Sequence, residues 1–429
     1  MFWYLTIMTV DVLHPDLGDP NADITSHDSY VTGFPHAAFQ RLRENAPVAW
    51  IEEEEGSGFW AVTKHADVID VSRDYKTFSA ARGIRIEEMA DDELEARRTL
   101  MEADPPEHTR LRRLVQPGFT PKVVATYEAA FRLLVGHVLD EVLAEEEFDF
   151  VTEIARELPI RMLCRLVGVP EEDAGAMVLW GDQMISNADP EYTPVIIDKV
   201  DTEEYRLLPF RAPAAIEIFR YAEEIALERR RNPADDILTT LLTAEPDGEP
   251  LTDLEFKNFF TLMMVAGNET TRHTISHGLI YLANHPDQLG AWMADPAAMS
   301  ETATEEILRA SSVTMHFRRT ATVDTQIRGV PVAAGDKVVI WYTSANYDID
   351  VFESPFTFDL SRVPNNHITF GTGRHVCLGA SLARLEVRVF FEEFLARVSG
   401  VDVGEPDRLR SNFISGIKHL PVNVRVSNH

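Results

Sequence analysis

Cysteine and positive charge are both scarce in this chain. Only two of its 429 residues are cysteines, Cys164 and Cys377, which excludes a disulfide framework and fits a reducing cytosol. Cys164 lies in an apolar helical pattern and is expected to be a buried, inert thiol. The 40 Lys and Arg residues face 70 Asp and Glu residues, giving a formal net charge of −30. This acidity argues against unspecific binding of nucleic acid, which needs a basic surface, and we expect an acidic, cytoplasmic protein.

Linkers, repeats and long apolar runs are also missing. A chain of this length often holds two or three domains, but no Gly/Ser-rich or Pro-rich linker and no internal repeat divides it. We therefore predict an N-terminal arm at 1–34 and a single domain at 35–429. The apolar run at 1–10 is too short to span a bilayer and lacks a basic start and a cleavage site, so no stable membrane anchor is expected. Met8 is an alternative start, which leaves open whether residues 1–7 belong to the natural protein.

The second cysteine lies in the most informative stretch, residues 370–379, with the sequence F-G-T-G-R-H-V-C-L-G. Gly371 and Gly373 allow a tight loop. Apolar residues then recur at spacings of four, three and four, which predicts an amphipathic helix: Leu378, Leu382, Leu385 and Val389. Cys377 thus precedes a helix N-terminus, where free N–H groups favour a thiolate suited to be an axial ligand of heme iron. The alternative is a glycine loop with a buried structural cysteine.

A very long helix is predicted after residue 252. Thr252 and Glu255 form a capping box, and the helical pattern continues to His285, a length of about 50 Å at 1.5 Å per residue. Its middle reads A-G-N-E-T-T at 266–271, where glycine costs about 1 kcal/mol relative to alanine. Small residues there would let a cofactor and dioxygen approach the backbone. The alternative is a buried helix with a polar notch packed against another helix.

Other patterns are informative mainly through their positions. His108 and Arg112 are four residues apart, so on a helix they share one face and can clamp carboxylates; the alternative is a basic helix end at the surface. Glu306 and Arg309, three apart, can pair on one helix face, as many surface residues do. The irregular connection at 186–212 is typical of a mobile cover over an apolar substrate.

The stretch 370–379 resembles the heme-binding loop of the cytochromes P-450, whose bacterial signature F-G-x-G-x-H-x-C-x-G is met at every fixed position. The other motifs follow in the family's order over roughly residues 35–425. The resemblance implies a mainly α fold with small β-sheets and a long central helix over heme b. It also implies a monooxygenase that uses O2 and two electrons to hydroxylate its substrate.

The resemblance assigns roles to individual residues. Cys377 would be the axial ligand of the heme iron, Thr270 would donate a hydrogen bond to the bound oxygen, and Glu269 would relay protons. Heme contacts would come from Phe370, Ala266 and Gly267, and propionate contacts from His108, Arg112, His375 and Arg319, with Arg318 as the alternative if the register slips by one. Glu306, Arg309 and Arg362 would form a buried network under the cysteine loop.

The substrate and the redox partner are inferred more broadly. The candidate pocket is largely apolar and indicates an apolar small molecule, with Leu262, Met263, Val265, Thr314, Met315, Phe413 and Ile414 as its residues. Two segments, 319–352 and 416–421, are similar to the bacterial branch acting on terpenoids, steroids and methyl-branched lipids. Natural-product tailoring of the polyketide type is the alternative, and a peroxide-driven peroxygenase and a non-enzymatic heme sensor are the rivals.

No reductase domain follows the cysteine loop. A monomer served by a separate ferredoxin and ferredoxin reductase is therefore expected. An arginine patch on the thiolate side would steer an acidic ferredoxin, and its members would be Arg110, Arg113, Arg374, Arg384 and Arg388.

Overall fold

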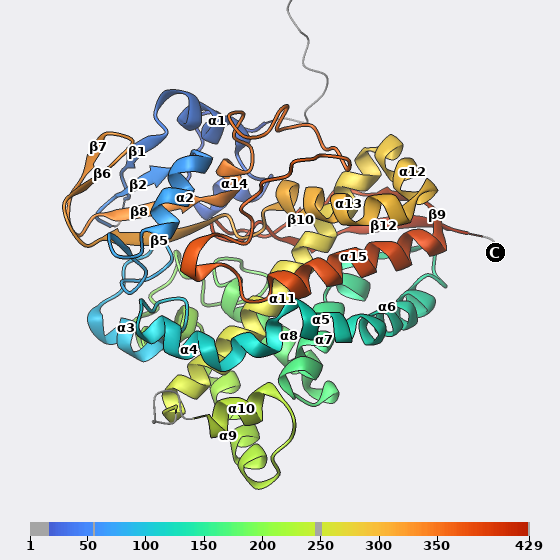
Figure 1. Ribbon diagram of the computed structural model, residues 1–429, viewed down its shortest axis with the longest axis horizontal. Helices are drawn as coiled ribbons and strands as arrows, with labels where there is room; N and C mark the ends of the chain where they lie inside the picture. The colour runs from blue at the N-terminus through green and yellow to red at the C-terminus, as the bar shows by residue number, and fades with distance from the viewer. Residues whose placement is uncertain (1–16, 55, 245–250, 428–429) are drawn as a thin grey trace, which may run out of the picture.

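The computed structural model describes residues 17–54, 56–244 and 251–427, and helices dominate it (Figure 1). The apolar run at 1–10 lies outside these residues. The helices before residue 250 are α1 (His36–Asn45), α2 (His65–Arg73), α3 (Asp91–Arg97), α4 (Glu107–Val115), α5 (Pro121–Val124), α6 (Glu128–Val142), α7 (Leu158–Val167), α8 (Ala174–Ile185), α9 (Ala214–Arg231) and α10 (Ile237–Thr243). The later ones are α11 (Asp253–Asn284), α12 (Pro286–Ala294), α13 (Pro296–Ser311), α14 (Tyr342–Ala345) and α15 (Ala380–Arg397). The predicted mainly helical class is confirmed.

Helix α11 crosses the middle of the molecule (Figure 1) and has 32 residues. Its start is the predicted capping box: the backbone N–H of Glu255 donates to Oγ1 of Thr252 at 3.1 Å, and that of Thr252 donates to Oε2 of Glu255 at 2.8 Å. The helix ends at Asn284 with His285 as its C-cap, and Pro286 then begins α12, close to the expected end. It packs against α7, α8, α9, α13 and α15, so most of its faces are buried.

The strands form small sheets at the edges of the helical body. The largest has the order β1-β2-β8-β5-β3, with only the β2–β8 pair parallel. Its strands are β1 (Val48–Ile51), β2 (Phe59–Val62), β3 (Phe78–Ser79), β5 (His316–Ala321) and β8 (Lys337–Trp341). The others are the sheet of β4 (Glu147–Asp149), β12 (Pro421–Val426) and β9 (Val398–Val403), and the pairs β6 (Thr325–Ile327) with β7 (Val330–Val332) and β10 (Asp407–Arg408) with β11 (Ile417–His419).

Residues 17–34, which the sequence assigned to an arm, lie against the C-terminal part of the chain. Nδ2 of Asn412 donates to the carbonyl oxygen of Thr25 at 2.6 Å, and the backbone N–H of Asn412 donates to Nδ1 of His27 at 3.1 Å. Ile24 and Tyr30 are buried in the core beside the large sheet. Within the described ranges, no helix is both long enough and apolar enough to cross a membrane.

Candidate active site

The cysteine loop has the predicted conformation. Gly371 and Gly373 have φ angles of 67° and 74°, and a Cβ atom on Gly373 would lie 2.8 Å from the carbonyl oxygen of Ser72. The backbone N–H of Cys377 donates to the carbonyl oxygen of Phe370 at 2.9 Å, and α15 begins three residues later, at Ala380. Cys377 lines a cavity inside the protein and is accessible from it.

The helix start alone does not make Cys377 a thiolate. Burial raises the pKa of this thiol, while the backbone N–H of Gly379 and the charges of Arg112 and Arg384 act in the opposite direction without cancelling the effect. A metal cation bound to the sulfur would supply the missing stabilisation, because coordination deprotonates a thiol. Cys164 is fully buried, and burial raises its pKa to about 12, as expected for an inert thiol.

Four basic side chains from three segments converge beside the loop: His108 and Arg112 on α4, Arg319 on β5 and His375 in the 3-10 turn Gly373–His375. The rings of His108 and His375 are 4.3 Å apart at their centroids. Burial and the neighbouring positive charges lower the pKa of His108 to about 4 and that of His375 to about 2. Among the residues that the structure describes, none of the four forms an ion pair.

The basic cluster also contains buried polar atoms that lack a hydrogen-bond partner. Both ring nitrogens of His108 and Nε2 of His375 are buried without a hydrogen-bond partner. Such groups are costly unless a ligand satisfies them. Together with the two unpaired arginines they fit a group that carries two carboxylates, as heme does with its propionates.

The structure decides between Arg318 and Arg319. Neighbouring residues of a strand point to opposite faces of the sheet. Nη1 of Arg318 donates to the carbonyl oxygen of Glu87 at 3.1 Å, away from the histidine pair, while Arg319 is close enough to His375 to lower its pKa. The structure therefore places Arg319, and not Arg318, at the basic cluster.

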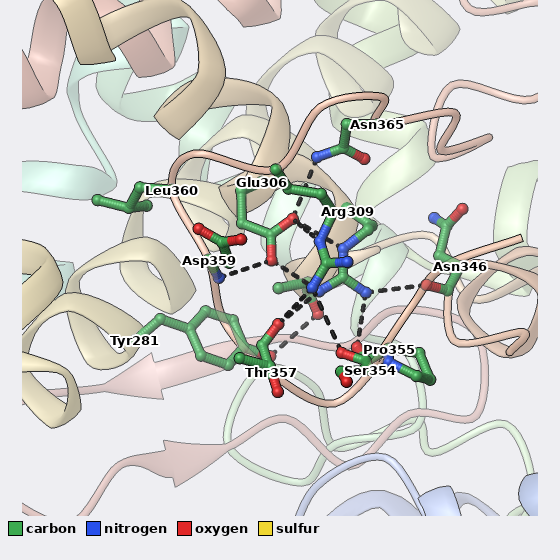
Figure 2. Close-up of polar contacts among 12 residues, drawn as sticks. Tyr281, Glu306, Arg309, Asn346, Ser354, Pro355, Thr357, Asp359, Leu360 and Asn365 are labelled. Atoms are coloured by element: carbon green, nitrogen blue, oxygen red, sulfur yellow. Dashed lines mark hydrogen bonds and ion pairs between the residues drawn. The ribbon is translucent and has the colours of Figure 1, made fainter.

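The predicted network of Glu306, Arg309 and Arg362 is present and buried. Figure 2 shows Glu306 and Arg309 at its centre. Arg309 donates from Nε and Nη2 to the two carboxylate oxygens of Glu306, both at 2.8 Å, and Nε of Arg362 donates to Oε2 at 3.1 Å. Both arginines also donate to backbone carbonyls of the 346–357 segment, namely those of Asn346, Pro355 and Thr357 for Arg309 and those of Glu353, Ser354 and Thr357 for Arg362. The network thus fixes the chain that leads into the cysteine loop.

Glu305, the neighbour of Glu306, was missed by the sequence reasoning. It accepts hydrogen bonds from Nε and Nη2 of Arg384 at 2.6 and 3.0 Å, and its other contact is Nε2 of His367 at 2.9 Å. The guanidinium of Arg384 lies 4.6 Å from the ring centroid of Phe370. Glu305 therefore ties α13 to α15 and to the first residue of the cysteine loop.

The notch in α11 lies opposite the loop, across the cavity. Ala266, Gly267 and Thr270 line the cavity, and Oγ1 of Thr270 donates to the carbonyl oxygen of Ala266 at 3.1 Å. A Cβ atom on Gly267 would also lie 2.9 Å from Cδ2 of Leu163 on α7. Glycine is thus needed for helix packing as well as for an open notch.

Glu269 does not line the cavity. Its side chain is fully buried on the side of α8 and pairs with Nη2 of Arg272, whose Nη1 donates to Oδ1 of Asp182 at 2.7 Å. Oδ2 of Asp182 accepts a hydrogen bond from Nη2 of Arg156 at 2.5 Å. Burial and the nearby Glu269 raise the pKa of Asp182 to about 7. Arg272 stands one helical turn after Glu269, a signal that the sequence reasoning overlooked.

The apolar cavity includes six of the seven predicted pocket residues: Leu262, Met263, Val265, Thr314, Phe413 and Ile414. Met315 was predicted wrongly. It is fully buried in a core cluster with Phe39 and Trp341, because in extended backbone it points away from the side of Thr314. Ile197 and Phe210, from the 186–212 connection, also line the cavity, as the cover interpretation expects.

Comparison with known proteins decides the family. The family model described as cytochrome P450 matches residues 33–290 and 299–413. The chain belongs to the cytochrome P450 family. It is therefore a heme-dependent monooxygenase, an enzyme class that activates O2 and acts on apolar substrates.

Several cytochromes P450 are similar over nearly the whole chain. The steroid C26-monooxygenase of Mycobacterium tuberculosis is 37% identical over 98% of this chain and 96% of its own length. The methyl-branched lipid omega-hydroxylase of the same organism is 40% identical over 90% of both chains. The structure of a Mycobacterium marinum cytochrome P450 in complex with pseudoionone has a TM-score of 0.83 and 37% identity, covering 96% of this chain and 100% of that one.

The residues of this cytochrome P450 fit heme. Cys377 would ligate the iron, and His108, Arg112, Arg319 and His375 would hold the propionates. Bound in this way, heme supplies the oxygen-activating chemistry, which cysteine ligation favours. The chain itself offers the hydroxyl of Thr270 at the cavity, apolar walls that exclude water and a buried acid behind the helix.

The arginine patch expected on the thiolate side is largely neutralised. Arg110 pairs with Glu255, Arg384 with Glu305, and Arg388 with Glu128 and Glu392. Arg374 lies 4.5 Å from the ring centroid of Tyr75. This cytochrome P450 still needs electrons from a redox partner, but a local positive field is weaker than the sequence indicated.

Proposed function

We propose that this cytochrome P450 hydroxylates an elongated apolar molecule of the steroid, terpenoid or methyl-branched lipid class. The observation that carries the proposal is the apolar cavity between Cys377 and the notch of α11, which extends outward to Phe210 and Ile197. The names of the two similar mycobacterial enzymes support the substrate class. In this proposal a separate ferredoxin and its reductase supply the electrons, and the enzyme works as a cytoplasmic monomer.

In this proposal Thr270 and Glu269 have different parts in delivering protons to the heme site. The hydroxyl of Thr270 stands at the cavity, where it would donate a hydrogen bond toward the heme site in place of its present bond to Ala266. After its carboxylate leaves Arg272, Glu269 takes up a proton that comes from solvent and passes it to that side of the helix. Asp182 takes over Arg272 at that moment, because it already binds the other side of the guanidinium.

The difference spectrum of the reduced, CO-bound protein tests the heme ligation. We expect the Soret band of thiolate-ligated iron, and its loss in Cys377→Ser. A histidine-type band in the wild-type protein would contradict the assignment of Cys377.

A panel of steroids, terpenoids and branched lipids, scored by the spin-state shift of the iron, tests the substrate class. Hydroxylated products should form with ferredoxin, reductase and O2. Turnover with hydrogen peroxide but none with the reductant chain would favour a peroxygenase instead.

A further inference from the structure

Several charged side chains interrupt the apolar wall of the cavity, and Arg85 is one of them. Arg85 belongs to the segment between β3 and α3 and lines the cavity together with Phe210 and Phe413. Its guanidinium carbon is 5.2 Å from the ring centroid of Phe413 and 5.9 Å from that of Phe210. Both rings are within reach of a cation–π contact with Arg85, and its side chain is only 13% exposed. A charged group is thus fixed at the surface that the substrate touches.

The hydrogen bonds of Arg85 are incomplete. Nη2 donates to Oε1 of Glu87 at 2.9 Å, but Nε is buried and has no partner. A buried donor without a partner destabilises the protein. An oxygen of the substrate, entering between Phe210 and Phe413, would remove this destabilisation.

Arg85 marks the outer end of the cavity. Glu87 and Glu88 follow it in the chain and also line the cavity, and their side chains are 38% and 51% exposed. The same cavity is lined by Cys377 and by Thr270 of α11. A long substrate that touches Arg85 therefore presents its opposite end to Thr270.

The charge of Arg85 is already balanced. Burial acts to raise the pKa of Glu87, but mainly the charge of Arg85, together with a backbone hydrogen bond, outweighs it and holds this pKa below its usual value, so the carboxylate stays ionised. A second carboxylate, such as that of a fatty acid, would be repelled by the negative charge of Glu87. A neutral oxygen would meet an unsatisfied N–H donor without that repulsion.

We propose that Arg85 is the polar anchor of the substrate and donates a hydrogen bond to a neutral oxygen, a ketone or a hydroxyl. This oxygen lies at the end of the apolar molecule remote from the carbon that is hydroxylated. The inference rests on the proposed function and narrows its substrate class to apolar molecules with a neutral oxygen at one end.

The test compares three ligands of equal length with the heme-loaded enzyme: 2-dodecanone, dodecane and dodecanoic acid. Spin-state titrations give the affinity of each for the wild-type protein, Arg85→Met and the control Arg82→Met. Arg82 pairs with Asp91 at the surface, is 56% exposed and is no part of this cavity. We expect the wild type to bind the ketone about tenfold more tightly than the alkane, as one hydrogen bond to a charged donor provides. Arg85→Met should remove this difference and leave dodecane unchanged, while Arg82→Met changes nothing.

Other outcomes would overturn the anchor. Equal affinity of the wild-type protein for 2-dodecanone and dodecane would contradict the proposed role of Arg85. This comparison needs no variant, so it remains valid even if Arg85→Met does not fold. If the wild-type protein binds dodecanoic acid most tightly of the three ligands, the proposal is also contradicted, because Arg85 would then bind a carboxylate. Glu87→Gln should shift the preference toward the acid, and an unchanged preference would contradict the charge argument.

The same experiment separates this anchor from the proposed function. If all three ligands are bound and hydroxylated but with equal affinities, the monooxygenase function stands and the anchor fails. If no ligand, dodecane included, shifts the spin state or is hydroxylated, the proposed function fails, and the anchor falls with it. Hydroxylation of 2-dodecanone at the carbons farthest from the ketone is the product pattern expected from an anchored substrate.

Discussion

Nη1 of Arg272 on α11 donates a hydrogen bond to Oδ1 of Asp182 on α8 at 2.7 Å. The same guanidinium pairs with Glu269, and all three side chains are at most 1% exposed. The acid expected to relay protons is therefore held in a buried group of two carboxylates and one arginine. Its freedom to move depends on how strongly Asp182 competes for Arg272.

Replacement of Asp182 by asparagine should slow proton delivery. Arg272 would then be paired with Glu269 alone, which fixes the glutamate more firmly on the far side of α11. We expect a fall in hydroxylation rate of about tenfold, less than the roughly 10²–10⁴-fold of general acid catalysis, because Glu269 itself is still present. The rate and the product formed per electron consumed, measured with the reductant chain, check this expectation.

The control for this variant is Glu172→Gln, an exposed acid just before α8. It should leave the rate and coupling unchanged. If Asp182→Asn behaves like this control, the competition for Arg272 has no part in proton delivery.

Thr270→Ala should uncouple oxygen use from hydroxylation. The variant removes the one hydroxyl of the A-G-N-E-T-T stretch whose Oγ1 bonds back to Ala266 at the cavity. We expect at least about tenfold less product per electron, the loss appearing as hydrogen peroxide. Thr270→Ser keeps the hydroxyl and should retain most of the coupling; equal coupling in all three proteins would refute the role of this hydroxyl.

Arg309→Ala should prevent heme loading. Removal of one partner from a buried charge network costs about 3–5 kcal/mol. Glu306 would lose both hydrogen bonds from Arg309 and keep Arg362 as its remaining charged partner. The absorbance ratio of heme to protein after purification measures the effect. The matched control is Arg220→Ala, since Arg220 and Glu217 have the same spacing of three on an exposed helix face. A surface pair of this kind contributes about 0–1 kcal/mol, so heme loading of the control should be normal. A fully loaded Arg309→Ala would contradict the structural role of the network.

Local patterns explain why much of this site was predictable. The capping box at Thr252 and the glycines of the cysteine loop each depend on neighbours within a few residues, and both have the expected geometry. Arg362 was found only because the family places an arginine at that distance from the cysteine. The contact of Arg362 with Glu306 spans 56 residues, and no local rule produces it.

The residues that were misassigned or missed depend on features that local sequence patterns do not determine. Met315 was assigned to the pocket although its neighbour Thr314 takes that side, and extended backbone allows only one of the two. The pairs Asp182–Arg272 and Glu305–Arg384 join residues 90 and 79 positions apart. Such pairs depend on how helices pack, and a single sequence carries no record of that packing.

A buried histidine beside the cavity leads to a prediction about pH. His316 is 1% exposed, its ring packs against Trp341 and Phe413, and neither ring nitrogen has a hydrogen-bond partner. Burial lowers its pKa to about 3, from an ordinary value near 6.5. The folded state thus excludes a proton that the unfolded chain binds. The resulting stability is present above pH 6.5 and is lost as the pH falls toward the folded-state pKa.

His316→Phe should remove this part of the acid sensitivity. At pH 5 the unfolded histidine is protonated and the folded one is not, which lowers the free energy of unfolding by about 2 kcal/mol relative to neutral pH. Denaturant unfolding of the heme-loaded protein at pH 7.5 and pH 5 measures the loss, which should be smaller in the variant by about that amount. Other buried histidines, such as His277, keep their share of the slope. His137→Phe, at a site 68% exposed, should leave the loss unchanged; an equal loss in His316→Phe would mean that His316 takes up its proton without unfolding.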